Sequence, residues 1–276
     1  MRLRIHIHPR PRITDVFRFA GYVHALGNSV PRGGTGALWF RGQADARWPL
    51  QPSAGRPLEE GGLRVAAMPN RDLYNQERVL LQRFKRDGYP FVQRVLTAWE
   101  AITLGQHHEL PTRLLDWTSN PLVALFFAAE THPNADAAVF AYRPRRPWDH
   151  HVSVFPGANP ARPKVPDPLK VRGIKIVFPM LLVDRLIVQS GGFTIQDPLV
   201  PIDTRGSERF DATSLDLLEL HRWILPSRAK HTILDQLHRV SVNRRTLFPG
   251  LDGVGHVLRE AERFRRMRGT FKRLQK

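Results

Sequence analysis

The sequence places a charged side chain where a buried strand is expected. Arg41 follows the large apolar residues Leu38, Trp39 and Phe40, and residues 37–41 predict a short strand that Gly42 ends. A buried charge is costly unless it is paired or bound to a ligand. The planar guanidinium suits bidentate binding of a phosphate or a carboxylate. The alternative, a structural ion pair, stays open.

The most polar stretch that could form a site runs from residue 106 to residue 118. It carries His107, Arg113 and Asp116 between two apolar segments that predict helices. A loop held at both ends by core elements is a usual place for a site. The start of the second helix would also attract an anion such as phosphate. In the alternative interpretation, Asp116 pairs with Arg113 and only helps to cap that helix.

Apolar spacing predicts the elements that position these residues. Helical periodicity indicates helices at 71–85, 91–105, 122–129, 227–240 and 254–274. The third of these has the clearest start, with capping side chains and then a proline in Thr118-Ser119-Asn120-Pro121. Short apolar runs indicate strands at 37–41, 137–142, 174–178, 186–189, 193–196 and 221–225. The expected fold class is α+β, with a central mixed or antiparallel sheet flanked by helices.

We expect these elements to fall into three parts. Residues 1–36 form an N-terminal extension, residues 37–258 the main domain, and residues 259–276 a basic C-terminal helix. Residues 143–170 hold seven prolines, which indicates a long surface excursion within the main domain.

Positive charge is concentrated toward the C-terminal end. The net charge is +17, and 35 of the 42 basic residues are Arg. From residue 222 to residue 276, 14 Arg and Lys stand against four acids, a net of +10. A concentrated basic surface favours polyanions. The expected nucleic-acid-binding residues are Arg259, Arg263, Arg266 and Lys272; a compositional bias of the genome and an acidic protein partner are the alternatives.

Composition also excludes several classes of protein and site. Without cysteine there is no disulfide, thiolate catalysis or cysteine-based zinc site. No apolar run approaches the roughly 18 residues that span a bilayer. The first residues lack the apolar core of a signal peptide, so we expect a cytoplasmic protein without a membrane partner. The histidines lack metal-ligand spacing, so no metal is expected. No P-loop, nucleophile elbow or GxGxxG supports an ATPase, a hydrolase or a dinucleotide-binding fold.

Several segments carry a resemblance to a known family. They are residues 39–43 (Trp-Phe-Arg-Gly-Gln), 48–53, Glu77 with the apolar residues after it, the long stretch 106–129, 189–194 and 247–253. On these segments the sequence resembles the FRG family, named for its Phe/Tyr-Arg-Gly motif, over roughly residues 38–258. Glu109 stands where that family more often has glycine.

The order of these segments resembles an ADP-ribosyltransferase core, which implies an ADP-ribosyltransferase-like fold and NAD as the substrate. In that core an arginine on the first strand holds the NAD phosphates and ribose. The resemblance therefore assigns NAD binding to Arg41, with Gly42 and Gln43 beside it. A second strand ends in Ser or Thr before a helix with an Ala-x-x-Phe pattern, which Thr118 and residues 124–127 match.

A third motif of that core supplies a catalytic glutamate, and here the sequence departs from the pattern. Asp184 and Arg185 stand at the corresponding positions. The departure moves the catalytic acid to Glu77 or Asp116 if catalysis is retained.

The chemistry of such a site sets three requirements. Breaking the nicotinamide–ribose bond needs a carboxylate beside the ribose, a cation on the diphosphate and an aromatic wall for the nicotinamide. Asp116 and Arg41 would supply the first two. Trp117 or Phe193 would supply the third, and Gln189 would position the ribose or the acceptor. We expect one cleft to bring together a catalytic His107, a cofactor-binding Arg113, Arg41, Asp116 and Gln189.

Two functions from different classes follow. The first is an NAD-dependent ADP-ribosyltransferase that modifies nucleic acid, as a toxin or antiphage effector with an antitoxin or other protein partner. The second is a non-catalytic module that binds a nucleotide or a nucleic acid. A buried cation among clustered titratable groups favours the enzyme.

Overall fold

The structure is a computed structural model. It describes residues 4–8, 12–32, 34, 36–56, 59–60, 63–64, 70–144, 152–153, 166–178, 188–203, 217–248, 250, 253–255 and 258. Several predicted features lie outside these residues. They are the basic residues Arg259, Arg263, Arg266 and Lys272, the acid position at Asp184 and Arg185, and most of the segments 143–170 and 254–274.

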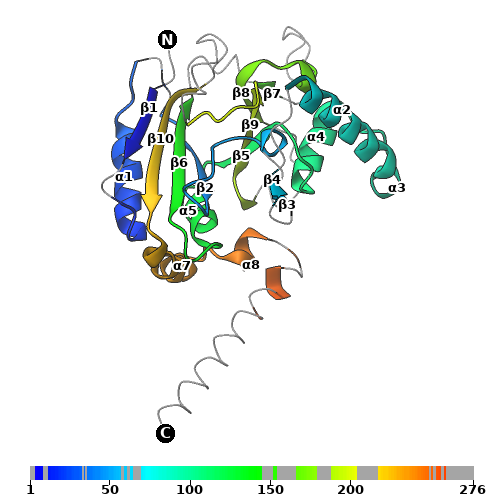
Figure 1. The fold of residues 1–276 in the computed structure, drawn as a ribbon. Coiled ribbons are helices and arrows are strands. Elements are labelled where there is room, and N and C mark those ends of the chain that lie inside the picture. Colours follow the sequence, from blue (N-terminus) through cyan, green and yellow to red (C-terminus); the bar gives the residue numbers. More distant parts are fainter. Residues whose placement is uncertain are drawn as a thin grey trace.

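Within the described residues, eight strands form one mixed sheet (Figure 1). Their order across the sheet is β1 (Arg4–His8), β10 (Leu217–Leu225), β6 (Ala137–Pro144), β2 (Trp39–Gln43), β5 (Leu114–Thr118), β9 (Gly191–Asp197), β8 (Gly173–Phe178) and β7 (Val152–Ser153). The two outermost pairs are parallel and the inner pairs antiparallel. A separate hairpin joins β3 (Glu59–Glu60) to β4 (Leu63–Arg64). The predicted α+β class with a mixed sheet is confirmed.

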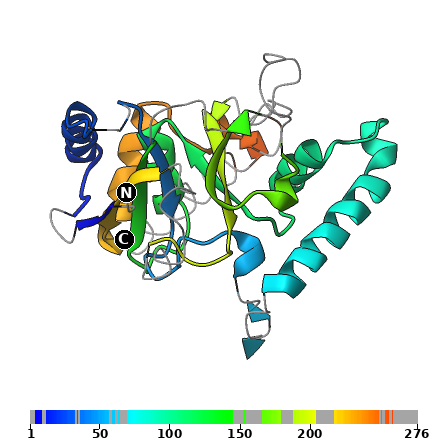
Figure 2. The same ribbon diagram turned by 90° about the horizontal axis from the view of Figure 1, so that it is seen from above.

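Helices flank this sheet, as expected. They are α1 (Val16–Asn28), α2 (Asn70–Asp87), α3 (Tyr89–Val92), α4 (Ala98–His107), α5 (Pro121–Ala129), α7 (Lys230–Arg239) and α8 (Arg244–Leu247), with 3-10 turns η1 (Ser53–Gly55), η3 (Pro168–Lys170) and η6 (Ser227–Ala229). Figure 2 shows α1 at one end of the molecule and α2 at the other. None of the helices described here is long and apolar enough to cross a membrane.

Two hydrophobic cores share one face of the sheet. Around β2 and β6, α5 packs with α1 and α7 in a core that contains Phe40. Around β5, β9 and β8, α4 and α2 pack in a core that contains Leu114. Alternation along the strands places Leu114, Thr118 and Phe40 on the same face, because Phe40 pairs with Thr118. Trp117 points into a third core on the opposite face.

The start of α5 follows the predicted capping pattern. Asn120 is the N-cap residue, and its side chain accepts a hydrogen bond from the backbone of Leu122 at 2.9 Å. Pro121 takes the first helical position, where its missing N–H has no cost. Thr118 steadies the turn, because its hydroxyl accepts from the backbone of Asn120 at 3.0 Å. The end of β5 and the start of α5 are therefore one tightly bonded corner.

The helix predicted at 91–105 is wrong in its first half. The chain forms the short α3 instead, and Gln93 ends it in the left-handed region with φ 55°. A new helix, α4, begins after Thr97, whose side chain and that of Glu100 make a capping box. The Thr-x-x-Glu pattern is a helix start signal that overrides the apolar spacing on either side of it.

The N-terminal extension joins the sheet. β1 pairs in parallel with β10, and α1 packs against α5 and α7. Neither element was predicted. Of the strand predicted at 186–189, only Val188 and Gln189 are described; Val188 is helical and Gln189 lies in the turn before β9.

Candidate functional site

A cavity of about 360 Å³ opens where β2 and β5 part. The two strands share a single register pair, Phe40 with Thr118. A continued antiparallel ladder would place Gly42 opposite Asp116, yet each strand keeps full pairing only on its other edge, with β6 and β9. Backbone edges and side chains of both strands are thereby exposed to a space closed by α5 and the end of α4.

Gly42 allows α5 to form one wall of this cavity. A Cβ atom on Gly42 would lie 1.9 Å from the carbonyl oxygen of Ala124 and 2.6 Å from the backbone nitrogen of Ala128. No side chain fits in that space, so glycine is required for the helix to lie directly on β2. The glycine of the Phe-Arg-Gly motif therefore sets the position of α5 next to Arg41.

Arg41 reaches across the gap between the strands. Its Nη1 donates to the backbone carbonyl of Asp116 at 2.9 Å and lies 3.6 Å from the Asp116 carboxylate. Its Nε is buried without a hydrogen-bond partner in the described part of the chain. Burial lowers the pKa of Arg41, and Asp116 opposes that shift. A partly buried guanidinium with an unused donor is suited to bind an anion that enters the cavity.

Asp116 is held beside Arg41 by a second residue. Gln106 donates from Nε2 to the Asp116 carboxylate at 2.8 Å, and its own carbonyl accepts from Thr112. The Asp116 side chain remains 55% exposed, so the carboxylate can meet a ligand. The predicted alternative, an Asp116–Arg113 pair, is not formed. Asp116 pairs with Arg41 instead.

Arg113 and Glu77 lie apart from the cavity and pair with each other. The Arg113 Nε and Nη2 atoms lie 2.7 and 2.6 Å from the Glu77 carboxylate, which also accepts from the Arg113 backbone at 3.1 Å. Both side chains are fully buried, and the Tyr74 ring covers the guanidinium at 4.8 Å. Neither residue lines the cavity. The cleft therefore brings together Arg41, His107, Asp116 and Gln189, without Arg113.

The remaining expected residues also line the cavity, and different contacts hold their side chains. Gln189 donates its amide to the Leu247 carbonyl at 3.0 Å, and its backbone carbonyl accepts from Thr118 at 2.6 Å. Trp117 buries its indole on the opposite face and donates to Thr194 at 2.9 Å. Phe193 is also buried but borders the space. His107, at the end of α4, and Gln43 complete the set.

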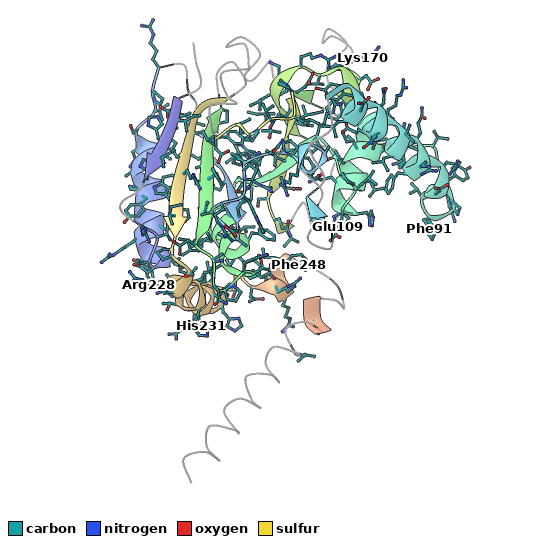
Figure 3. The ribbon with its side chains drawn as sticks, in the orientation of Figure 1. Phe91, Glu109, Lys170, Arg228, His231 and Phe248 are labelled. Atoms are coloured by element: carbon teal, nitrogen blue, oxygen red, sulfur yellow. The ribbon has the colours of Figure 1, made fainter. Side chains whose placement is uncertain are left out.

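Sequence reasoning missed several lining residues. They are Arg56, Trp48, Gln106, Glu109, Phe127 and Glu130. Glu130 is ion-paired with Arg244 at 2.6 Å, and Phe248 packs edge-on against Phe127 with ring centroids 6.1 Å apart. Figure 3 labels Glu109, on the turn after α4, and Phe248, directly after α8. Trp48 and Gln106 lie within the sequence segments that resemble the FRG family, whereas no sequence pattern indicated Arg56 as a site residue.

The described residues contain no group of three or more His, Asp or Glu side chains that could hold a metal ion. The side chains that line the cavity supply guanidinium, carboxylate, imidazole and amide groups among aromatic rings.

Comparison with known proteins gives one match. The model of the FRG domain family matches residues 36–137, a shorter range than the resemblance noted in the sequence. No curated protein and no solved structure matches the chain. The matched range contains β2, α4, β5 and α5, which together build most of the cavity. This part of the chain is an FRG domain.

Proposed function

We propose that this protein is an NAD-dependent ADP-ribosyltransferase whose acceptor is nucleic acid. One observation carries the proposal: Arg41 presents a partly buried guanidinium, with an unpaired Nε, to a cavity that also holds a half-exposed carboxylate, Asp116. A cation and an anion held side by side match the two charges of the reaction, the diphosphate of NAD and the developing positive charge on its ribose.

Each of these groups would act on a different part of the reaction. The bond between ribose C1′ and the nicotinamide nitrogen breaks, and its electron pair leaves with nicotinamide, which departs neutral. An acceptor oxygen or nitrogen bonds to C1′ and gives up a proton. Arg41 would bind the diphosphate and Asp116 would stabilise the cationic ribose. His107 borders the same cavity as a candidate base for the acceptor's proton.

The arrangement of parts supports the same proposal. The strand with Arg41 and the strand that ends in Thr118 are neighbours, and the second leads directly into α5. This is the order of the ADP-ribosyltransferase core that the sequence resembles. Phe193 offers an aromatic surface next to Asp116, its register partner on β9.

The acceptor class follows from charge. A net charge of +17, concentrated toward the C-terminal end, favours a polyanionic acceptor. A toxin or antiphage effector that an antitoxin restrains is the cellular role that fits such an activity. Charge reversal at Arg263 and Arg266 should flatten the dependence of duplex binding on salt, since each phosphate contact contributes about 0.9 to the slope. Binding that does not change with salt would point to a protein acceptor.

One observation favours a second function, a non-catalytic nucleotide-binding module. Asp116 is already bonded to Arg41 and Gln106, and the Gln189 amide is bonded to Leu247. A site whose polar groups hold one another could bind a nucleotide without activating it.

Labelled NAD separates the two functions. The protein is incubated with NAD labelled on the adenylate, together with separate pools of DNA, RNA and protein, and transfer of label is measured beside nicotinamide release. Label on nucleic acid supports the transferase with the proposed acceptor. If the protein binds the nucleotide but releases no nicotinamide and transfers no label to any of the three pools, the protein is a binding module instead.

A further inference from the structure

The segment after β2 is fixed rigidly against the cavity. Gln51 donates from its side chain to the carbonyls of Gly55 at 2.8 Å and Leu199 at 2.6 Å. Ser53 and Ala54 exchange hydrogen bonds with Thr112, just before β5. These contacts hold η1 in place, and the residue that follows it, Arg56, lines the cavity.

Arg56 has few partners for its charge. Its Nε donates to the Gln51 carbonyl at 2.9 Å, which fixes the direction of the guanidinium. Across the described residues the two terminal nitrogens make no hydrogen bond or ion pair. Burial and the nearby charge of Arg41 lower the pKa of Arg56, whereas Asp116 raises it. Arg56 is exposed and lines the same cavity as Arg41, so the two positive charges repel each other there.

Three carboxylates line the cavity beside these two cations, and they differ in their partners. Asp116 is the one that interacts with both, and it forms its ion pair with Arg41. Glu130 is paired with Arg244 outside the strand gap. Glu109 also borders the space, on an exposed turn after α4. Arg41 and Arg56 therefore share Asp116, and an anionic ligand bound between the two guanidiniums would offset their mutual repulsion.

We propose that Arg41 and Arg56 together form a clamp for a diphosphate, with one guanidinium on each phosphate. The ligand class is then a nucleoside diphosphate or its conjugate. The inference rests on the proposed function for NAD as the particular conjugate. The clamp itself needs only the two arginines and the cavity that both of them line.

The geometry favours a diphosphate over other anions. A single phosphate satisfies one guanidinium fork and leaves the other cation uncompensated. A nucleic-acid backbone would track an extended basic groove, whereas this space is a pocket bordered by α5, the end of α4 and Arg56. A volume of about 360 Å³ is within the usual range for small-molecule sites.

The test is equilibrium binding of adenosine, AMP, ADP and ADP-ribose to the full chain, measured by calorimetry at fixed salt. We expect ADP and ADP-ribose to bind more tightly than AMP. Arg56→Gln should weaken ADP roughly tenfold to a hundredfold, the usual loss for a charge-assisted hydrogen bond, and should reduce the preference for ADP over AMP. Adenosine binding should not change.

Arg47→Gln is the matched control. Arg47 lies on the same connection, is 84% exposed, pairs with Asp45 and does not line the cavity. The Arg47→Gln protein should bind ADP with the same affinity as the unsubstituted chain. Arg56→Lys keeps the charge without the planar fork and should fall between the two. Thermal unfolding of each variant checks that the fold is kept.

Three results would overturn the clamp. They are equal affinity of the unsubstituted chain for ADP and AMP, no ADP binding at all, and an Arg56→Gln protein that binds ADP normally. The first two need no variant, so they decide the question even if Arg56 variants fail to fold. ADP binding as expected without NAD consumption would overturn the transferase and keep the clamp. NAD consumption with no preference for ADP over AMP would do the reverse.

Discussion

Phe40 and Thr118 form the only register pair between β2 and β5, and from this point the two strands diverge. The pair fixes where the sheet opens. Arg41 follows Phe40 by one residue and Asp116 precedes Thr118 by two, so the divergence places these two charges across the gap. A sheet that paired fully at this point would have no cavity. The divergence of two central strands thus creates the site.

Arg41→Lys should abolish NAD turnover while the protein stays folded. Lysine keeps the positive charge but loses the fork that binds two phosphate oxygens, so we expect a loss of roughly a hundredfold or more. Nicotinamide release measures the effect, and thermal unfolding checks the fold. Arg47→Lys, on an exposed side chain outside the cavity, is the control. Full turnover in a folded Arg41→Lys protein would exclude the bidentate role.

Gly42→Ala should destabilise the protein by about 1–3 kcal/mol or more, because the added methyl group overlaps the backbone of α5 at Ala124 and Ala128. The free energy of unfolding in urea measures the change. Gly21→Ala is the control, since it lies inside α1 with open space around it and should stabilise by about 0.5–1 kcal/mol. A neutral Gly42→Ala would mean that α5 can shift away from β2.

The parts of the site that follow local rules could be predicted from the sequence. Apolar runs bounded by turn residues indicated β2 and β6, and the Asn-Pro start indicated α5. These features depend on spacing along a few residues, which a single sequence shows directly. The prediction that the whole polar stretch 106–118 is a loop is wrong, because its residues Leu114–Thr118 form β5, the strand that carries Asp116.

The rest of the site depends on contacts between distant segments. Asp116 and Arg113 are three residues apart, and nothing local shows that the first pairs with Arg41 and the second with Glu77 on α2. Arg56 lines the cavity because Gln51 and Ser53 attach its segment to Leu199 and Thr112. Such tertiary hydrogen bonds leave no periodic signal. The split between β2 and β5 is likewise a property of the assembled sheet.

Glu77→Gln should destabilise the fold instead of acting on turnover alone. The substitution leaves the Arg113 guanidinium fully buried without a counter-charge, a loss of about 3–5 kcal/mol. Chemical denaturation measures it. The matched control is Asp87→Asn, which breaks the exposed pair with Arg86 and should leave the unfolding midpoint unchanged. A stable Glu77→Gln protein with lost turnover would restore Glu77 as a candidate catalytic acid.

Acid should destabilise the protein at the edge of the sheet, where three histidines stack. His6 and His8 on β1 stack against His221 on β10, with His8 Nε2 3.1 Å from His221 Nδ1. Burial, followed by the charge of His6, lowers the pKa of His221 to about 4, although Glu219 opposes the shift. The Trp223 ring closes the stack at a centroid distance of 5.7 Å from His221.

The direction in which stability changes with pH follows from the linkage between folding and proton binding. The unfolded chain protonates His221 near pH 6.5 and the folded chain near 4, so the unfolded state gains protons first as the pH falls. The contribution of His221 to the free energy of unfolding is therefore fully present above about pH 6.5. It is lost as the pH falls toward 4, a change on the order of 3 kcal/mol. The carboxyl groups of Asp45 and Glu100, with pKa values of about 2, act mainly at lower pH. Urea denaturation at a series of pH values gives the profile. His221→Gln should flatten the decline between pH 6.5 and 4, whereas His231→Gln, on the surface of α7, should not. An unchanged profile in His221→Gln would assign the decline to other groups.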